Sequence, residues 1–340
     1  MKFSALVLIA LMASAWLPNA ALAQISEDEE FSDRDIQDGK RTSREQCEAT
    51  RDAVWVEHRE SSECIRYYPS ANVTGAKHAA FFFHGDRLDG RFVIGGGASV
   101  SRPSALRKES EGLARVNGVP YIFVGRPGVY GSSGRHTERR SPKEYLSLNA
   151  AVDAIKARYG LERVSLAGQS GGASSVGALL TLGRSDVACA VASSGGFDTL
   201  SRSADIAART GAQFRGCDAH GLCGAYNVID HVGGVAASEP RRIFIVGDPQ
   251  DSNTVFKYQQ AFADKLAAAG HAVTVVEAEG RGPARHGLAH MANRVLGWCN
   301  AGFDSERIKA LARSNAPALH APKPKPQTGA SQPSAESEPQ

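Results

Sequence analysis

Short apolar runs alternate with longer segments of helical periodicity through the middle of the chain, from about residue 47 to about residue 314. The apolar runs are rich in valine, isoleucine and phenylalanine and end at glycine or charged residues, which is typical of buried strands. We expect strands over residues 53–61, 64–70, 78–86, 121–128, 163–169, 187–197, 241–248 and 271–278. The segments between them predict helices over residues 105–118, 141–160, 171–183, 254–270 and 287–299.

The order of these elements predicts the fold class. The first two strands are close in sequence and form an expected antiparallel pair, and helices separate most of the later strands. This alternation indicates an α/β fold with a mostly parallel sheet that helices cover on both faces. Because ligands of such sheets bind at the carboxyl ends of the strands, we expect the functional residues in the loops that follow them.

The two ends of the chain differ in composition from this domain of residues 47–314. Residues 1–23 combine Lys2, an apolar core and a small-residue end at Ala21-Leu22-Ala23, which is the pattern of a secretory signal peptide. Residues 24–46 are polar and acidic and predict a linker, and residues 315–340 are rich in proline, serine, alanine and lysine and predict a disordered tail. The sequence therefore predicts a periplasmic or secreted protein that has no membrane contact after signal cleavage.

Export changes how the cysteines are interpreted, because an even number of cysteines in an oxidising compartment predicts disulfides. The six cysteines are Cys47, Cys64, Cys189, Cys217, Cys223 and Cys299. Closeness in sequence favours the pairs Cys47–Cys64 and Cys217–Cys223, which would leave Cys189 with Cys299. No C-x2-C pair occurs, so the spacing does not predict a zinc site.

The net charge limits the kinds of macromolecule that we expect the protein to bind. The formal net charge is +3 at pH 7, and no basic helix or strip of aromatic and basic residues occurs, so nucleic acid is not an expected partner. The sequence does not indicate an oligomeric state.

The chemistry begins with the pentapeptide Gly168-Gln169-Ser170-Gly171-Gly172, which fits the pattern G-x-S-x-G at a predicted strand-to-helix junction. Glycines at these positions allow a sharp turn that exposes the serine hydroxyl at the top of the sheet. A serine nucleophile needs a base, and the base needs an orienting acid. On this kind of fold the chain order is serine, acid, histidine.

Two acids and two histidines compete for these roles after the later strands. Asp248 and Asp251 follow the strand expected over 241–248, and His286 and His290 follow the strand expected over 271–278. The order Ser170, Asp251, His286 is therefore available in the chain.

Together these segments resemble the α/β-hydrolase superfamily, and within it the catalytic domain of the prolyl oligopeptidase-like serine hydrolases. The motifs that carry the resemblance lie between Ala79 and Leu288 and are "FFFHGD", "GRPGVYGSSG", "GQSGG", "VGDPQDSNTVFKYQQAFADKLAAAG" and "RHGL". In that family the acid follows a strand-end glycine after two or three residues, and the histidine precedes glycine and a hydrophobic residue. The resemblance therefore favours Asp251 over Asp248 and His286 over His290.

The resemblance also suggests how the remaining parts of the site are arranged. One oxyanion donor is the backbone N–H of Gly171, and the family's H-G turn implies a second donor at the backbone of Asp86, with Gly85 close behind. Arg126 and Tyr130 are candidate pocket residues, with an ordinary solvated loop as the alternative. Residues 198–240 lie where this fold places a lid, and here the insertion is short.

The sequence thus predicts a serine hydrolase that cleaves an ester or a peptide or amide bond of a small-molecule ester or peptide substrate through an acyl-enzyme, without metal or organic cofactor. Whether the substrate is an ester or a peptide stays open. The alternative from another class is a non-catalytic binding protein with the α/β-hydrolase fold.

Overall fold

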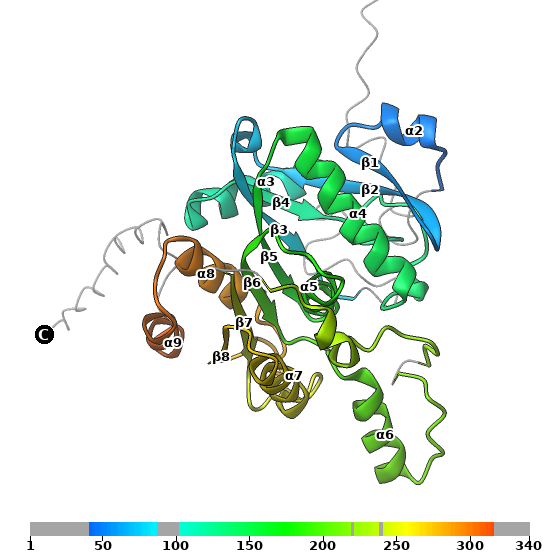
Figure 1. Ribbon diagram of the computed structural model, residues 1–340, viewed down its shortest axis with the longest axis vertical. Helices are drawn as coiled ribbons and strands as arrows, with labels where there is room; N and C mark the ends of the chain where they lie inside the picture. The colour runs from blue at the N-terminus through cyan, green and yellow to red at the C-terminus, as the bar shows by residue number, and fades with distance from the viewer. Residues whose placement is uncertain (1–40, 87–101, 219–220, 238–240, 316–340) are drawn as a thin grey trace, which may run out of the picture.

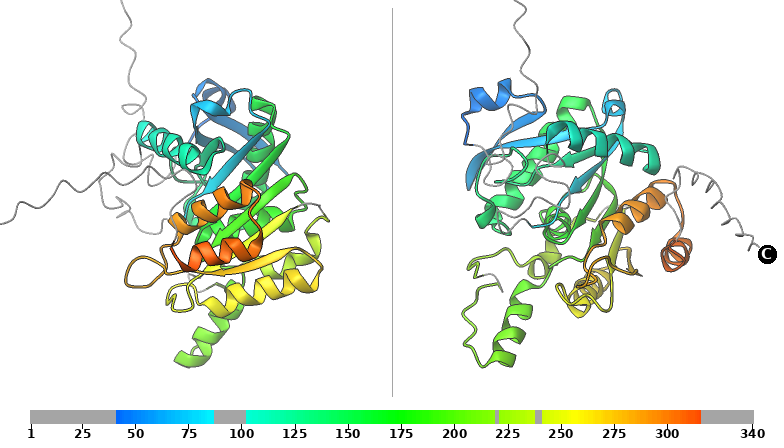
Figure 2. Two further views of the ribbon diagram at one scale, coloured as in Figure 1. Left: turned by 90° about the vertical axis from the view of Figure 1, so that its left-hand side faces the viewer. Right: turned by 180° about the vertical axis from the view of Figure 1, so that it is seen from behind.

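The computed structural model of the protein describes residues 41–86, 102–218, 221–237 and 241–315 (Figure 1). The expected signal peptide, most of the expected linker and nearly all of the expected C-terminal tail lie outside these residues. The described part has one central sheet with helices packed on its two faces (Figure 2).

The eight strands of the sheet run in the order β1-β2-β4-β3-β5-β6-β7-β8. β1 pairs antiparallel with β2, and β2 pairs antiparallel with β4, whereas every pair from β4 onward is parallel. The strands are β1 (Ala53–His58), β2 (Ser61–Pro69), β3 (His78–Phe83), β4 (Tyr121–Val124), β5 (Arg163–Gln169), β6 (Val187–Ser193), β7 (Arg242–Gly247) and β8 (Val273–Glu277). The prediction of a mostly parallel sheet with an opening antiparallel pair is confirmed.

The central strands are apolar throughout because both faces of the sheet are buried. In β3, Phe81 and Phe83 belong to one hydrophobic core and Phe82 belongs to the other, as the two-residue period of a strand requires. The first core contains residues of α4 (Pro142–Tyr159), α5 (Gly171–Thr181) and α7 (Phe256–Ala268). The second contains residues of α3 (Pro103–Asn117), α8 (Ala289–Asn300) and α9 (Ser305–Arg313).

The helix α4 shows how local sequence sets the bounds of these elements. Ser141 is the N-cap and its hydroxyl accepts a hydrogen bond from the backbone N–H of Glu144, while Pro142 occupies the first turn. The helix ends at Gly160, which adopts the left-handed conformation that glycine tolerates best. Among the described residues, no helix combines the length and the apolar character needed to cross a membrane.

Three helices were not expected from the sequence: α2 (Arg44–Ala49), α6 (Thr199–Thr210) and α9. α2 begins inside the range expected to be linker, and α6 lies in the expected lid segment. Each starts at a side chain that caps a backbone N–H, namely Ser43, Asp198 and Asp304. They bury only one or two residues each.

Three disulfides are present: Cys47–Cys64 and Cys217–Cys223, which closeness in sequence favoured, and Cys189–Cys299, the pair that these two leave. The first ties α2 to β2, and the second ties the middle of the sheet to α8. The third closes a small loop that follows α6.

The lengths of the closed loops predict how much each disulfide stabilises the fold. The Cys189–Cys299 bridge spans 110 residues and the Cys217–Cys223 bridge spans 6. Because a cross-link restricts the unfolded chain more when its loop is longer, the double variant Cys189→Ala/Cys299→Ala should lose about 2.6 kcal/mol more unfolding free energy than Cys217→Ala/Cys223→Ala. Urea unfolding of the two variants measures the difference, and equal losses would contradict it.

Candidate active site

Ser170 lies on the turn between β5 and α5, with backbone angles φ 56° and ψ −120°. A positive φ is strained for a residue with a side chain, and such strain is concentrated at functional sites. The turn is held by the Ser170 backbone N–H, which donates to the Ser193 carbonyl on the neighbouring strand β6 at 2.8 Å. The sequence pattern G-x-S-x-G therefore folds into the strand-turn-helix that it predicted.

The glycines around Ser170 are required by close backbone approach. A Cβ on Gly168 would overlap the Gly172 carbonyl, and a Cβ on Gly172 would overlap the Phe83 carbonyl at the end of β3. A Cβ on Gly171 would overlap the carboxylate of Asp86. The turn is thus pressed directly against the segment that follows β3.

His286 and Asp251 are joined by a hydrogen bond of 2.8 Å between Nδ1 and Oδ2. The Asp251 side chain is fully buried, and its other oxygen accepts from the backbone N–H groups of Asn253 and Thr254 at 2.8 and 2.9 Å. The remaining ring nitrogen of His286, Nε2, is buried and has no hydrogen-bond partner among the described residues. Asp251 therefore fixes the orientation of the His286 ring through Nδ1, while Nε2 has no hydrogen-bond partner among the described residues.

Asp248, the competing acid, is committed elsewhere. Its Oδ2 accepts from the Gly280 N–H at 2.8 Å and from Arg285 Nε at 2.7 Å, and its Oδ1 accepts from the Gln250 N–H. Burial acts to raise the pKa of this carboxyl, but these hydrogen bonds and the charge of Arg285 lower it below its ordinary value. Asp248 holds the loop that carries His286 and does not contact the ring.

Two residues that hold the backbone of the loop around His286 were not predicted from the sequence. The Gln169 side chain donates to the His286 carbonyl at 2.8 Å and accepts from the Leu288 N–H at 2.9 Å. Ser194 Oγ donates to the same His286 carbonyl at 3.0 Å. Gln169 lies inside the G-x-S-x-G motif, so its position was visible in the sequence, but its partners over 100 residues away were not.

His84 stabilises the turn after β3 and is not a base for Ser170. Its Nε2 accepts from the Arg126 N–H at 3.1 Å, so Nδ1 carries the proton and donates to the Gly85 carbonyl at 2.7 Å. A Cβ on Gly85 would lie 3.4 Å from the Cβ of Ser170. The turn that was expected to supply an oxyanion donor therefore lies beside Ser170.

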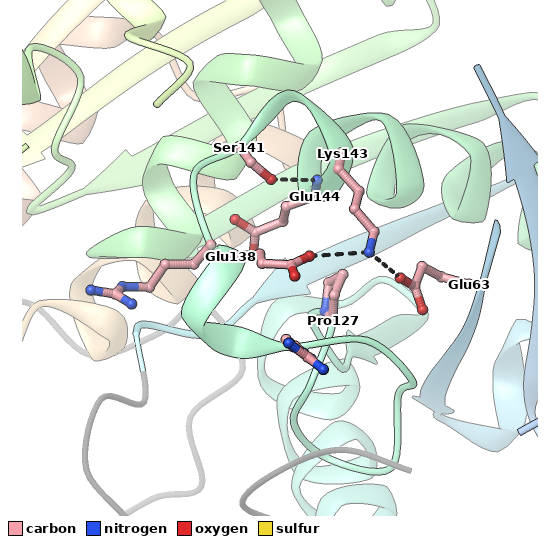
Figure 3. Close-up of a pocket in the computed structure, with 8 residues that line it drawn as sticks. Glu63, Pro127, Glu138, Ser141, Lys143 and Glu144 are labelled. Carbon is pink, nitrogen blue, oxygen red and sulfur yellow. Dashed lines mark hydrogen bonds and ion pairs between the residues drawn. The ribbon is translucent and has the colours of Figure 1, made fainter. Parts of the chain in front are cut away.

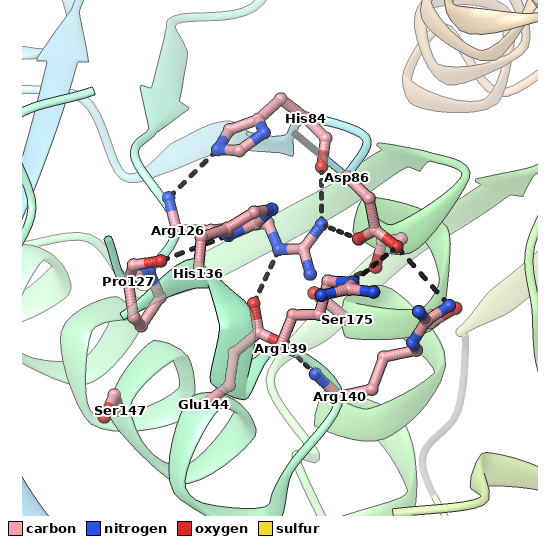
Figure 4. Close-up of polar contacts among 12 residues, drawn as sticks. His84, Asp86, Arg126, Pro127, His136, Arg139, Arg140, Glu144, Ser147 and Ser175 are labelled. Carbon is pink, nitrogen blue, oxygen red and sulfur yellow. Dashed lines mark hydrogen bonds and ion pairs between the residues drawn. The ribbon is translucent and has the colours of Figure 1, made fainter. Parts of the chain in front are cut away.

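The structure corrects the expectation that Arg126 and Tyr130 line the pocket. Arg126 is completely buried and its side chain points toward Asp86 (Figure 4). The Tyr130 ring packs edge-on against His84 with centroids 4.5 Å apart. The loop after β4 folds inward because it is tied to β2, where the Ser133 N–H donates to the Cys64 carbonyl at 2.8 Å. Arg126 and Tyr130 consequently contact the turn after β3, through Asp86 and His84.

Arg126 is the centre of a buried network of charges (Figure 4). Its Nη1 donates to Asp86 Oδ1 at 2.8 Å and its Nε donates to Glu144 Oε1 at 2.7 Å. Arg139 and Arg140 lie 3.5 and 3.4 Å from Asp86 Oδ2. Burial alone would raise the pKa of Asp86, but Arg126 and Arg140 outweigh it and hold that pKa well below the ordinary value.

A pocket of about 350 Å³ joins these parts, and among the described residues Ser170, His286, Asp86, Arg140 and Arg202 line it. This volume lies within the range of about 300–1,000 Å³ that is usual for small-molecule sites. Arg202 comes from α6, in the segment expected to be a lid.

A second pocket lies on the other side of the network, between Glu63, Lys143 and Glu138 (Figure 3). Its volume is about 10 Å³, which is room for about one water molecule. Lys143 is already paired with Glu63 at 3.0 Å and with Glu138 at 3.1 Å. This pocket therefore does not compete as a substrate site.

The remaining candidate metal-binding residues do not form a metal site among the described residues. His290 lies on α8, and burial, followed by the charges of Arg281 and Arg294, lowers its pKa to about 4. In the part of the chain that the structure describes, no group of three or more His, Cys, Asp or Glu side chains is arranged to hold a metal ion.

No protein-family model and no curated protein sequence matches the chain. Among solved structures, acylaminoacyl peptidase from Pyrococcus horikoshii superposes with a TM-score of 0.50 at 13% identity, over 75% of this chain and 43% of that one. The esterase Pf2001 from Pyrococcus furiosus gives a TM-score of 0.45 at 17% identity, over 70% of this chain and 87% of that one. Est1E from Butyrivibrio proteoclasticus gives 0.47 at 15% identity, over 74% and 98%.

The chain has the α/β-hydrolase fold. The superposition on the peptidase and the mostly parallel sheet agree on this, and the peptidase extends well beyond the part that this chain matches. In the α/β-hydrolase fold the elbow serine, the acid and the histidine follow one another along the chain. Here Ser170 follows β5, Asp251 follows β7 and His286 follows β8.

The buried network predicts a pH dependence of stability through His136. Burial, followed by the charge of Arg126, lowers the pKa of His136 to about 4 from its ordinary value of 6.5. As pH falls below 6.5 the unfolded chain takes up this proton before the folded protein does, so protonation favours unfolding.

Between pH 7 and pH 5 this one group should remove about 2 kcal/mol of unfolding free energy. The variant His136→Gln should show a correspondingly smaller loss between the two pH values in urea unfolding. Equal losses in the variant and the unmodified protein would contradict the assignment.

Proposed function

We propose that this protein is a serine hydrolase that cleaves an ester or a peptide or amide bond, with Ser170 as nucleophile, His286 as general base and Asp251 as orienting acid. The observation that carries the proposal is the His286–Asp251 hydrogen bond. It leaves Nε2 of His286 without a hydrogen-bond partner among the described residues, and His286 lines the same pocket as Ser170. An oriented imidazole with one unoccupied nitrogen near a strained serine is the arrangement that activates a hydroxyl.

The proposed reaction has two stages. Ser170 Oγ attacks the acyl carbon while His286 Nε2 takes the hydroxyl proton, and Asp251 stabilises the resulting imidazolium. The tetrahedral intermediate then collapses, the leaving group takes the proton from His286, and the acyl group remains on Ser170. Water, deprotonated by His286, attacks the acyl carbon. As the bond from that carbon to Ser170 Oγ breaks, His286 returns the proton to Oγ and the carboxylic acid is released. Approach of Oγ to Nε2 accompanies substrate binding, since catalytic hydrogen bonds often tighten only in the complex.

The oxyanion would be stabilised at the start of α5. Gly171 is the first residue of that helix, so its N–H has no partner within the helix and lies at the positive end of the helix dipole. The backbone N–H of Asp86 is the proposed second donor. A carboxylate beside an oxyanion would normally oppose catalysis, but the Asp86 side chain is neutralised by its ion pairs with Arg126 and Arg140.

We also propose a periplasmic or secreted location. The signal-like pattern of residues 1–23 and the three disulfides support it, because structural disulfides persist in oxidising compartments.

A fluorophosphonate probe tests the nucleophile. The unmodified protein should be labelled and Ser170→Ala should not, because the probe reacts with an activated serine hydroxyl. Ser174, another serine lining the pocket, provides the matched control, and Ser174→Ala should keep the label. Equal labelling of the unmodified protein and Ser170→Ala would exclude Ser170, and an unreactive unmodified protein would favour the non-catalytic alternative.

The two neighbouring aspartates test the acid. Asp251→Asn should lower kcat on a 4-nitrophenyl ester by roughly three to four orders of magnitude, because the imidazolium loses its partner. Asp248→Asn should cost much less, because Asp248 acts only through the loop that carries His286. The opposite ranking of the two variants would assign the role to Asp248.

A further inference from the structure

Arg202 is a pocket cation without a close counterion. It lies half-buried on α6 and lines the pocket together with Ser170 and His286. Within the described ranges, no carboxylate lies within 4.0 Å of its guanidinium, whereas Arg140 in the same pocket is paired with Asp86 at 3.4 Å and with Asp218 at 3.1 Å.

The charges of Asp218 and Asp251 favour the charged form of Arg202, but both carboxylates are engaged by other groups. The network behind the pocket has as many carboxylates as guanidinium groups, namely Asp86, Glu144 and Asp218 against Arg126, Arg139 and Arg140. His136 is neutral at pH 7 because its pKa is about 4. Asp251 is engaged by His286 and by two backbone N–H groups. Among the described residues that line the pocket, Arg202 is therefore the arginine that no ion pair engages.

The surroundings of Arg202 destabilise its positive charge in the free protein. Burial, followed by the nearby charge of Arg140, lowers the pKa of Arg202 below its ordinary value, which means that its charged form is disfavoured where it stands. An anion bound beside Arg202 would offset both effects. A purely structural arginine gains nothing from facing the pocket rather than solvent or a carboxylate.

We propose that Arg202 binds a carboxylate of the substrate, so that the bond broken by Ser170 belongs to a small ester or amide with one negative charge. This inference rests on the proposed hydrolase function. A planar carboxylate matches the forked geometry of a guanidinium, and its single charge matches the single uncompensated cation better than a phosphate dianion does. The pocket volume of about 350 Å³ fits a small substrate.

Paired substrates of equal length provide the test. The mono-4-nitrophenyl ester of adipic acid carries a carboxylate at the far end of the acyl chain, and 4-nitrophenyl hexanoate is its neutral counterpart. A second pair places the charge on the leaving group, with the hexanoate ester of 4-hydroxybenzoate against that of its methyl ester. In one of the two pairs kcat/KM should favour the charged substrate by about tenfold or more, as expected for a hydrogen-bonded charge pair.

The variants assign this preference to Arg202. Arg202→Met should bring the charged-to-neutral ratio close to one, and Arg202→Lys should keep part of it. Arg209 lies exposed on the same helix, so Arg209→Met makes the same change of charge outside the pocket and should leave the ratio as it is. Added salt should lower the ratio in the unmodified protein.

The outcomes separate the two proposals. A ratio at or below one for both pairs, or a preference that survives in Arg202→Met, overturns the carboxylate site while the hydrolase function stands. Fluorophosphonate labelling of each variant shows that its active site is folded. An unmodified protein that neither reacts with the probe nor hydrolyses any of the four esters overturns both proposals together.

Discussion

The contact between Arg126 and Asp86 is the constraint on which the site depends. A fully buried guanidinium costs several kcal/mol unless it is paired, so Arg126 must keep its bonds to Asp86, Glu144 and the His84 carbonyl. These bonds join the turn after β3 to the start of α4. Loss of one partner would leave a buried charge uncompensated, and the network therefore specifies a single arrangement of the two segments.

The elbow is positioned against this fixed turn through backbone contact. Gly172 lies against the Phe83 carbonyl and Gly171 lies against the Asp86 carboxylate, so neither position has room for a side chain. This close packing fixes the distance between Ser170 and the proposed oxyanion donors, and it cannot relax easily. Gln169 also links the elbow to the backbone of the loop that carries His286, so that the positions of Ser170 and His286 are coupled.

The sequence predicted the parts of the site whose signals are local. The apolar strands and the strand-turn-helix around Ser170 could be predicted because each depends on neighbouring residues. Asp248 and Asp251 could not be separated on residue types alone, since the difference lies in which carboxylate the loop geometry turns toward His286. Arg126 and Tyr130 were misplaced because the inward fold of their loop depends on β2. α6 was missed although its N-cap residue, Asp198, is visible in the sequence.

The proposed catalytic residues and the proposed substrate-binding residue, Arg202, are held in place by different parts of the fold. Ser170, Asp251 and His286 follow strands of the central sheet and are held by buried backbone contacts, whereas Arg202 comes from a helix that buries only Thr199 and Ala207. The segment after α6 is nevertheless tied to the network, because Asp218 in the Cys217–Cys223 loop pairs with Arg140. Under the proposed function, a substitution on α6 would change which substrate is bound without disturbing the elbow, and one framework would serve substrates of different charge.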